Sequence, residues 1–236
     1  MLLNIDHLSV SIDGLRVLEG ITLDVSKGQL VAVVGANGAG KSTLLRTISG
    51  LDKPLGGTVK FEGQDITGLH PKIIADLGIA MVPEGKRLFY EMTVVENLKI
   101  GGYKFRKDTV RIKKNMDRVF ELFPVLAKNQ NRIASTFSGG EQQMITIGRG
   151  LMGEPKLLMI DELSLGLAPI VIDMLMGVIK KLNREGTTII LVEQNINQVL
   201  KIADYGYVIE NGVLTLSGPG EDLRNNKHVK VAYLGL

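Results

Sequence analysis

The sequence predicts an α/β protein that has a mainly parallel core sheet, an N-terminal antiparallel β subdomain and an inserted α-helical subdomain. Three features of the hydropathy pattern lead to this prediction. Apolar and polar residues alternate through the first part of the chain, which is typical of half-buried antiparallel strands. Short, uninterrupted apolar runs follow at separated places, which is typical of strands covered on both faces of a parallel sheet. A long stretch of helical periodicity separates the first run from the others.

The strands can be placed along the chain from these patterns. Residues 2–25 predict the antiparallel strands. The apolar runs predict buried parallel strands at Leu30–Val34, Leu157–Ile160 and Ile189–Val192. Near the C-terminus, Asn211-Gly212 stands between apolar pairs and predicts a β-hairpin over residues 206–213.

The helices follow from apolar residues at helical spacing. One helix is predicted over Ser42–Ser49, with Gly50 placed to end it, and another over Pro169–Asn183. Residues 94–126 also have a helical pattern and carry many Lys and Arg side chains, so they look like a helical insert. A basic helix surface is more often a solvated face than a nucleic-acid surface.

The composition bounds the class of protein. The chain has 236 residues, of which 44% are hydrophobic, enough for one domain or two small lobes. It has no apolar run near the roughly 18 residues of a membrane span and no signal-peptide pattern, so we expect a cytosolic protein without a transmembrane segment. The absence of Cys excludes disulfides, a cysteine nucleophile and thiolate metal sites. A net charge of +3 and 5% aromatic residues argue against a nucleic-acid partner.

A phosphate-binding loop is the strongest motif in the chain. Residues 35–42 match G-x-x-x-x-G-K-S directly after an apolar run and before a predicted helix, as the motif requires. Its glycines let backbone N–H groups approach phosphate oxygens, Lys41 adds charge toward the β- and γ-phosphates, and Ser42 offers a hydroxyl to Mg²⁺. The residues predicted to bind the nucleotide phosphates are Gly35, Ala36, Asn37, Gly38, Ala39, Gly40, Lys41, Ser42 and Thr43.

Two acids, Asp161 and Glu162, directly follow the second apolar run. Ligands bind outside the carboxyl ends of parallel strands, so both acids should face the crevice of the phosphate loop. We expect Asp161 to hold Mg²⁺ and Glu162 to orient or deprotonate the water that attacks the γ-phosphate. Because successive strand residues face opposite sides, one of the pair could instead be a solvated acid at the strand end.

The stretch Ser138-Gly139-Gly140-Glu141 is a second candidate site. The spacing of Ser138 and Glu141 predicts a capping box at a helix start. The two glycines leave that helix end bare and so open to a second phosphate. Taken alone, the stretch would indicate only a helix cap.

In order along the chain, the phosphate loop, the stretch Phe137–Glu141 and the Asp161-Glu162 pair resemble the ATP-binding subunit of ABC transporters. The resemblance covers essentially the whole chain. It implies a P-loop NTPase fold with a RecA-like core in a single nucleotide-binding domain. The implied boundaries are a core of 1–87 and 155–236 and a helical subdomain of 88–154.

The resemblance also implies cofactors and partners. ATP and Mg²⁺ would be bound, and Ser138, Gly139, Gly140 and Glu141 would close over the ATP of a second ATPase subunit, either a copy of this chain or a similar companion. The helical insert would grip a short helix of transmembrane permease subunits, with an extracytoplasmic solute-binding protein as an indirect partner. The chain would then lie peripherally on the cytoplasmic face of the cell membrane.

Some phrases are similar to the ATP-binding proteins of high-affinity branched-chain amino acid importers. These are Val82–Gly85, Phe137–Gln143, Ser164–Pro169, Leu191–Asn195 and Ala232–Gly235. The likeness implies branched-chain amino acids as cargo, while urea and short amides stay possible because other chains recognise the substrate.

Three candidate site positions, and one neighbouring position, depart from the general ABC pattern. Glu84 stands where a glutamine usually senses Mg²⁺ and the attacking water, and its carboxylate could ligate the metal. Gln194 replaces the usual histidine; it can donate a hydrogen bond to the γ-phosphate but cannot ionise. Ile12 replaces the aromatic that stacks on adenine, so Ile12 and Val17 would make apolar contact with the base. Leu163 also stands where proline is usual.

The leading hypothesis is therefore the ATP-hydrolysing subunit of an ABC importer, with Glu162, Gln194 and Glu84 in catalysis and Ser42, Asp161 and Glu84 around Mg²⁺. Three alternatives stay open: an ABC ATPase that acts on nucleic acid or ribosomes, a different phosphate-loop enzyme such as a GTPase or kinase, and a poorly hydrolysing regulatory ABC subunit. The chain has no N-K-x-D guanine-reading motif, which argues against a GTPase.

Overall fold

The fold is known from a computed structural model, which describes residues 1–234. Gly235, at the end of the closing phrase Ala232–Gly235, lies outside the described residues. Among residues 1–234, no helix has the length and apolar character to cross a membrane.

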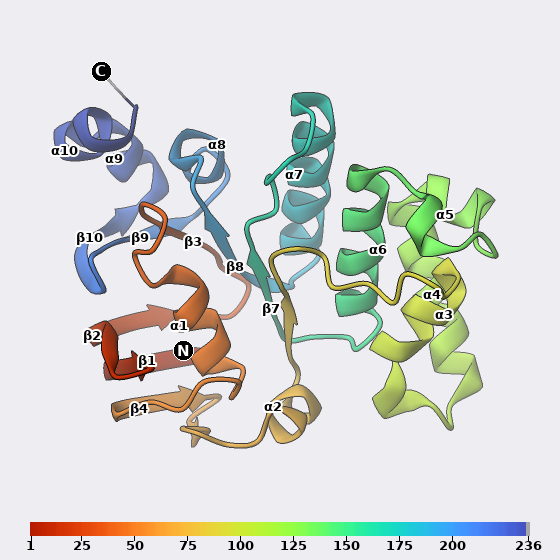
Figure 1. The fold of residues 1–236 in the computed structure, drawn as a ribbon, viewed down its shortest axis with the longest axis horizontal. Coiled ribbons are helices and arrows are strands. Elements are labelled where there is room, and N and C mark those ends of the chain that lie inside the picture. The colour runs from red at the N-terminus through yellow and green to blue at the C-terminus, as the bar shows by residue number, and fades with distance from the viewer. Residues whose placement is uncertain (235–236) are drawn as a thin grey trace.

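A small antiparallel sheet forms one part of the molecule (Figure 1). Its strand order is β2-β1-β4-β5. The strands are β1 (Leu3–Ile12), β2 (Leu15–Val25), β4 (Gly56–Phe61) and β5 (Gln64–Asp65). The prediction of antiparallel strands over residues 2–25 is confirmed, because β1 and β2 pair antiparallel from Leu3↔Val25 to Ile12↔Leu15.

The second sheet has the order β10-β9-β3-β8-β7-β6. Its strands are β3 (Leu30–Val34), β6 (Ile79–Val82), β7 (Leu157–Asp161), β8 (Thr188–Glu193), β9 (Tyr205–Glu210) and β10 (Val213–Pro219). Strands β9, β3, β8, β7 and β6 run parallel, and β10 closes the predicted hairpin with β9. Every residue of β3, β7 and β8 is buried, as the apolar runs predicted.

The helices surround the parallel sheet (Figure 1). They are α1 (Lys41–Ile48), α2 (Pro71–Leu77), α3 (Val94–Gly101), α4 (Thr109–Leu122), α5 (Pro124–Lys128), α6 (Gly139–Leu151), α7 (Pro169–Arg184), α8 (Ile196–Leu200), α9 (Gly220–Asn225) and α10 (Lys227–Val229). The short helical segments are η1 (Tyr103–Phe105), η2 (Ala134–Thr136) and η3 (Lys230–Leu234).

The basic stretch over residues 94–126 is helical, as predicted, but it is divided into α3, η1, α4 and the start of α5. Gly101 is the last residue of α3 and lies close to α6, since an added Cβ would be 1.9 Å from the carbonyl oxygen of Arg149. Glycine at this position lets α3 lie directly against α6 before the chain turns into α4.

The two faces of the parallel sheet belong to two hydrophobic clusters. One face, with Leu30, Ala32 and Val34 of β3, packs in a cluster with apolar side chains of α3 to α7. The other face, with Val31 and Val33, packs with α1 and the small sheet. The parallel sheet is thus covered on both sides. The boundaries of the helical subdomain, residues 88 and 154, stay predictions.

An ion pair fastens α4 to the segment after α6. Arg111 of α4 binds Glu154 at 2.9 Å between Nε and Oε1 and at 2.5 Å between Nη2 and Oε2. The Arg111 guanidinium also lies 3.8 Å from the centre of the Phe105 ring. Hydrogen bonding from Arg111 lowers the pKa of Glu154 to about 2.

The contribution of the Arg111–Glu154 ion pair to the free energy of unfolding should depend on pH. The pKa of Glu154 is lower in the folded protein than the ordinary value of 4.5, so the pair stabilises the fold above about pH 4.5 and loses its effect as the pH falls toward 2. Because both side chains are partly exposed, we expect Glu154→Gln to lower the free energy of unfolding by only about 0.5–1 kcal/mol at pH 7. Urea denaturation across pH should show this loss shrinking below about pH 4.5. The exposed Glu121 provides the control Glu121→Gln, and a loss for Glu154→Gln that stays constant with pH would contradict this role.

Candidate functional site

The candidate site lies at the carboxyl edge of three parallel strands. The phosphate loop follows β3, Asp161 ends β7, and Glu193 ends β8. The register pairs Val34 with Glu193 and Asp161 with Val192, so the ends of the three strands are level. Segments that are more than a hundred residues apart in sequence therefore meet at one edge.

The phosphate loop keeps its shape through close backbone approaches. A Cβ on Gly35 would lie 2.1 Å from the carbonyl oxygen of Ile209. Gly40 has φ +102°, and its Cβ would lie 2.4 Å from Cδ2 of Leu18 and 3.0 Å from the carbonyl oxygen of Val17. Helix α1 begins at the next residue, so its first N–H groups point toward the loop.

Lys41 is 4% exposed and folds back into this loop. Its Nζ donates to the carbonyl oxygens of Gly35 at 2.8 Å and Ala36 at 2.9 Å. Burial lowers the pKa of Lys41, while the charges of Glu162 and Asp161 act in the opposite direction. The ammonium group is therefore held at the centre of the predicted phosphate cradle.

Ser42 and Asp161, the two residues predicted to lie at the metal, are in direct contact. The Ser42 hydroxyl donates to Oδ1 of Asp161 at 3.0 Å. Burial raises the pKa of Asp161 to about 6, although the Ser42 bond acts against this shift. Both residues line a cleft of about 370 Å³ together with Glu84, which follows β6. A hydroxyl and two carboxylates fit Mg²⁺, and a cation would offset the cost of the buried charge.

Glu162 is half-buried and has a left-handed backbone with φ +47°. Its N–H donates to the carbonyl oxygen of Val192 at 3.0 Å. Left-handed conformations are costly for residues other than glycine, and such strain gathers at functional sites. Gln194 is exposed directly after β8 and before α8.

The two residues predicted to contact the adenine base, Val17 and Ile12, lie in different surroundings. Val17 lies against the phosphate loop, as the short distance between its carbonyl oxygen and the Gly40 Cβ position shows. Ile12 is 37% exposed at the end of β1, where it pairs with Leu15 in the hairpin. The contact of both side chains with adenine stays a prediction.

The stretch 138–141 forms the expected capping box at the start of α6. Ser138 accepts from the N–H of Glu141 at 3.4 Å, and Oε2 of Glu141 accepts from the N–H of Ser138 at 2.8 Å. Gly140 packs tightly on α7, since an added Cβ would lie 2.6 Å from Cγ1 of Val171. In Figure 1, α7 and β7 stand between this end of α6 and α1, so the chain does not bring this stretch to its own phosphate loop.

Two contacts of α6 were missed from the sequence. Arg149 donates to the carbonyl oxygen of Arg87 at 2.8 Å, and Thr146 donates to that of Lys86 at 3.2 Å. Lys86 and Arg87 both have positive φ, at +64° and +43°. Helix α6 therefore holds the turn that follows Glu84, a contact between segments about 60 residues apart that no local pattern signals.

The buried acid Glu193 was also missed. Its carboxylate accepts from the N–H of Ser164 at 2.9 Å and from the Ser164 hydroxyl at 2.7 Å. Burial raises the pKa of Glu193, while the two bonds from Ser164 lower it. The available signal was an acid that closes the otherwise apolar run of β8, immediately before Gln194.

The geometry at Gly40 predicts the effect of one added methyl group. Gly40→Ala introduces a left-handed alanine, at a cost of about 1–2 kcal/mol, and brings its Cβ 3.0 Å from the fixed backbone oxygen of Val17. We expect the loop to shift and the affinity for a fluorescent ATP analogue, measured by titration, to fall about tenfold or more.

Gly177→Ala is the matched control, because Gly177 lies within α7 with nothing within 4 Å of its Cβ position. It should bind nucleotide like the wild type. Wild-type affinity in Gly40→Ala would show that the loop tolerates the methyl group.

Comparisons with known proteins point to one family. A family model described as ABC transporter matches residues 18–164. BraG of Pseudomonas aeruginosa, a high-affinity branched-chain amino acid transport ATP-binding protein, is 47% identical over 99% of this chain and 100% of its own length. LivF of Archaeoglobus fulgidus, a probable branched-chain amino acid transport ATP-binding protein, is 36% identical over 94% of each chain.

Solved structures show the same fold. An ATP-binding cassette of an ABC transporter in its ADP conformation has a TM-score of 0.86 and 29% identity, covering 100% of this chain and 99% of that one. A nucleotide-free cassette has a TM-score of 0.85 and 30% identity, with 95% and 94% covered. Since the family model and a relative at 47% identity together span nearly all of its length, the chain belongs to the ABC transporter family, as one of its ATP-binding domains.

Proposed function

We propose that this ATPase drives an importer of branched-chain amino acids. The observation that carries the proposal is the meeting of the phosphate loop, Asp161 and Glu162 at the edge of the parallel sheet, in a chain 47% identical to BraG over nearly its full length. The cargo is inferred from the relatives' names, because the motifs at this edge are those of a nucleotide site and do not indicate an amino acid site.

The phosphate loop binds the nucleotide, and Ser42 with Asp161 and Glu84 binds the metal ion. The backbone N–H groups of residues 35–43 and the Lys41 ammonium bind the phosphates. Ser42, Asp161 and Glu84 hold Mg²⁺, as their shared cleft supports. When bound, Mg²⁺ neutralises the charge that develops on the phosphate oxygens.

Glu162 and Gln194 act on the attacking water and the γ-phosphate. Glu162 accepts the proton of the water, and its place directly after Asp161 keeps it beside the metal ligands. Gln194, at the end of the neighbouring strand, donates a hydrogen bond to the γ-phosphate. Ile12 and Val17 would contact the adenine base.

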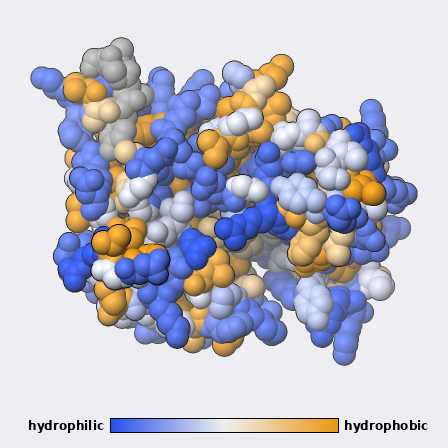
Figure 2. Space-filling model, in the orientation of Figure 1, coloured by the Kyte–Doolittle hydropathy of each residue, from blue (hydrophilic) through white to orange (hydrophobic). Residues whose placement is uncertain are grey.

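A second ATPase subunit completes the site. The stretch Ser138–Glu141 lies away from the chain's own phosphate loop, so it would bind the ATP of a partner (Figure 1). Figure 2 shows apolar surface over the end of α7, where Leu165, Ile170 and Met174 are 55%, 79% and 40% exposed. Such a patch is typical of an interface. The partner is a second copy or a companion; Pseudomonas aeruginosa also has BraF, to which this chain is 32% identical.

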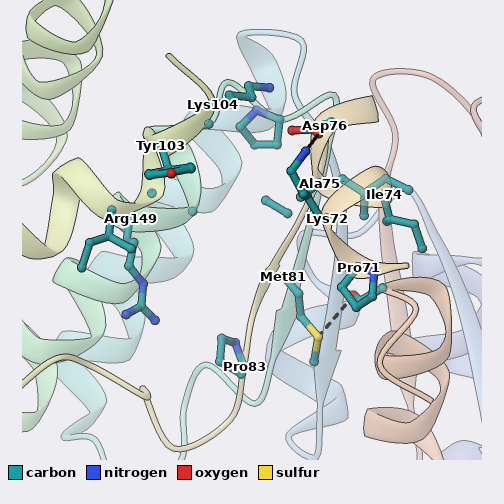
Figure 3. A pocket seen from close by; sticks show the side chains of 18 of the residues that line it. Pro71, Lys72, Ile74, Ala75, Asp76, Met81, Pro83, Tyr103, Lys104 and Arg149 are labelled. Carbon is teal, nitrogen blue, oxygen red and sulfur yellow. Dashed lines mark hydrogen bonds and ion pairs between the residues drawn. The ribbon is translucent and has the colours of Figure 1, made fainter. Parts of the chain in front are cut away.

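A second cleft supports docking on a permease. It has a volume of about 600 Å³ and lies between α2 and β6 on one side and α3, η1 and α6 on the other. Figure 3 shows Met81, Ala75 and Ile74 facing Tyr103, Lys104 and Arg149 across it. We propose that a short permease helix binds here, which would place the chain peripherally at the cytoplasmic face of the membrane, with a solute-binding protein as an indirect partner.

Glu162→Gln tests the proposed base. The amide keeps the shape of the side chain but cannot take the proton, so ATP turnover should fall at least about a hundredfold while ATP binding remains. Size-exclusion chromatography with ATP and Mg²⁺ should then show a trapped dimer. Glu221→Gln, an exposed acid on α9, is the control and should turn over ATP normally. Undiminished hydrolysis by Glu162→Gln would show that Glu162 is not the base.

Tyr103→Ala tests the docking cleft. Tyr103 is 62% exposed and lines the cleft, so its loss should weaken a permease complex about tenfold or more without disturbing the phosphate loop. Co-purification with the permease and uptake of labelled amino acid should both fall, while ATPase activity of the isolated subunit stays near wild type. Val110→Ala, which truncates an exposed apolar residue on α4 outside this cleft, is the control. Normal co-purification by Tyr103→Ala would place the permease elsewhere.

A further inference from the structure

Glu193 is a buried carboxylate that the proposed hydrolysis does not use. It is 1% exposed at the end of β8, a strand whose other residues are apolar except Thr188. Both of its carboxylate oxygens are bonded to one residue, because Oε1 accepts from the Ser164 N–H at 2.9 Å and Oε2 accepts from the Ser164 hydroxyl at 2.7 Å. The Glu193 side chain thus binds both the backbone and the side chain of Ser164.

Ser164 lies two residues after Glu162, in the loop that joins β7 to α7. This loop is fixed to β8 at two places. One is the backbone bond from the Glu162 N–H to the carbonyl oxygen of Val192, at 3.0 Å, and the other is the pair of bonds from Ser164 to Glu193. The left-handed backbone of Glu162, with φ +47°, stands between these two fastenings.

Glu193 also fixes the position of the residue that follows it, Gln194. Its backbone is held in the sheet by the pairing with Val34, and Gln194 is the next residue. The Glu193 side chain therefore connects the loop that carries Glu162 with Gln194, the residue proposed to bind the γ-phosphate. A movement of either would strain the bonds between Ser164 and Glu193.

Stability alone does not account for an acid at this position. Burying a carboxylate is costly, and replacing buried ionic groups with apolar side chains is often neutral or stabilising. Leu191, two residues before Glu193 and on the same face of β8, is fully buried among apolar side chains, so such side chains fit this face of the strand. The fixed geometry that the carboxylate provides is the remaining benefit, since hydrogen bonds to a charged group are short and directional.

We propose that Glu193 is a positioning residue for ATP hydrolysis: through Ser164 it holds Glu162 and Gln194 in one rigid arrangement around the γ-phosphate. Because Glu162 is the proposed base, this role of Glu193 rests on that assignment. Neither Glu193 nor Ser164 need touch the nucleotide, so their loss should affect turnover and spare binding.

Steady-state ATPase kinetics of the purified full chain test this role in a double-mutant cycle of Glu193→Gln and Ser164→Ala. Each change should lower kcat about tenfold and leave KM for ATP within about twofold, because small misplacements of reacting groups cost rate. The double variant should be no slower than Glu193→Gln alone, since both changes break the same contact. Ser164→Thr keeps the hydroxyl and the N–H and should retain near wild-type kcat.

Tyr207→Phe is the matched control for a lost buried hydrogen bond. Tyr207 is 7% exposed and its hydroxyl donates to the carbonyl oxygen of Asp24 at 2.9 Å, on the side of the sheet that faces the small sheet. It should lower the melting temperature without lowering kcat. An equal loss of kcat in Tyr207→Phe, losses that multiply in the double variant, or unchanged kcat in both single variants would each overturn the role of Glu193.

Two further comparisons separate failure of the Glu193 role from failure of the Glu162 assignment. If Glu193→Gln does not fold, the difference in kcat between Ser164→Ala and Ser164→Thr tests the positioning role by itself. Glu162→Gln is measured in parallel. Wild-type turnover in Glu162→Gln would refute the assignment of Glu162 as the base. Lost turnover in Glu162→Gln together with normal kcat in Ser164→Ala would refute only the role of Glu193.

Discussion

The parallel pairing of β3, β8 and β7 is the constraint on which the rest of the structure depends. It buries both faces of these strands, so polar groups can stand only where the strands end. Because the pairing is in register, these ends meet, and they carry the phosphate loop, Asp161 and Glu193. The burial that stabilises the sheet also raises the pKa of Asp161, because it disfavours the charged carboxylate, and a bound cation would offset that cost.

The segment that follows β6 lines both the proposed metal cleft and the proposed permease cleft. Pro83 and Arg87 line the larger cleft beside α2 and α3, and they also line the smaller cleft beside Ser42 and Asp161. Helix α6, whose first turn is the Ser138 capping box, holds this loop through Thr146 and Arg149. If a permease helix binds in the larger cleft, as proposed, it would contact the segment that carries Glu84 and so connect the permease to the proposed nucleotide site.

The sequence predicted most of the fold because its strongest patterns come from complete burial. The apolar runs of β3, β7 and β8 and the alternation over β1 and β2 all correspond to strands. Strands β4, β5 and β6 were not predicted. Strands β5 and β6 have only 2 and 4 residues, and β4 begins with two glycines, so only Val59 and Phe61 alternate with a polar residue there. The helical stretch over residues 94–126 gave no sign that α3 ends at Gly101 or that this glycine packs against Arg149, because that contact depends on how α3 lies on α6.

The sequence by itself determined the local chemistry: the phosphate loop, the strand-end acids and the capping box are all short-range patterns, and each lies in the element that its spacing requires. Only the tertiary structure decided which distant groups act together. The bonds from Ser164 to Glu193 and from Arg149 to Arg87 join segments 29 and 62 residues apart. Such contacts leave no periodic trace, because each partner is a single polar residue whose position depends on how the sheet and helices pack.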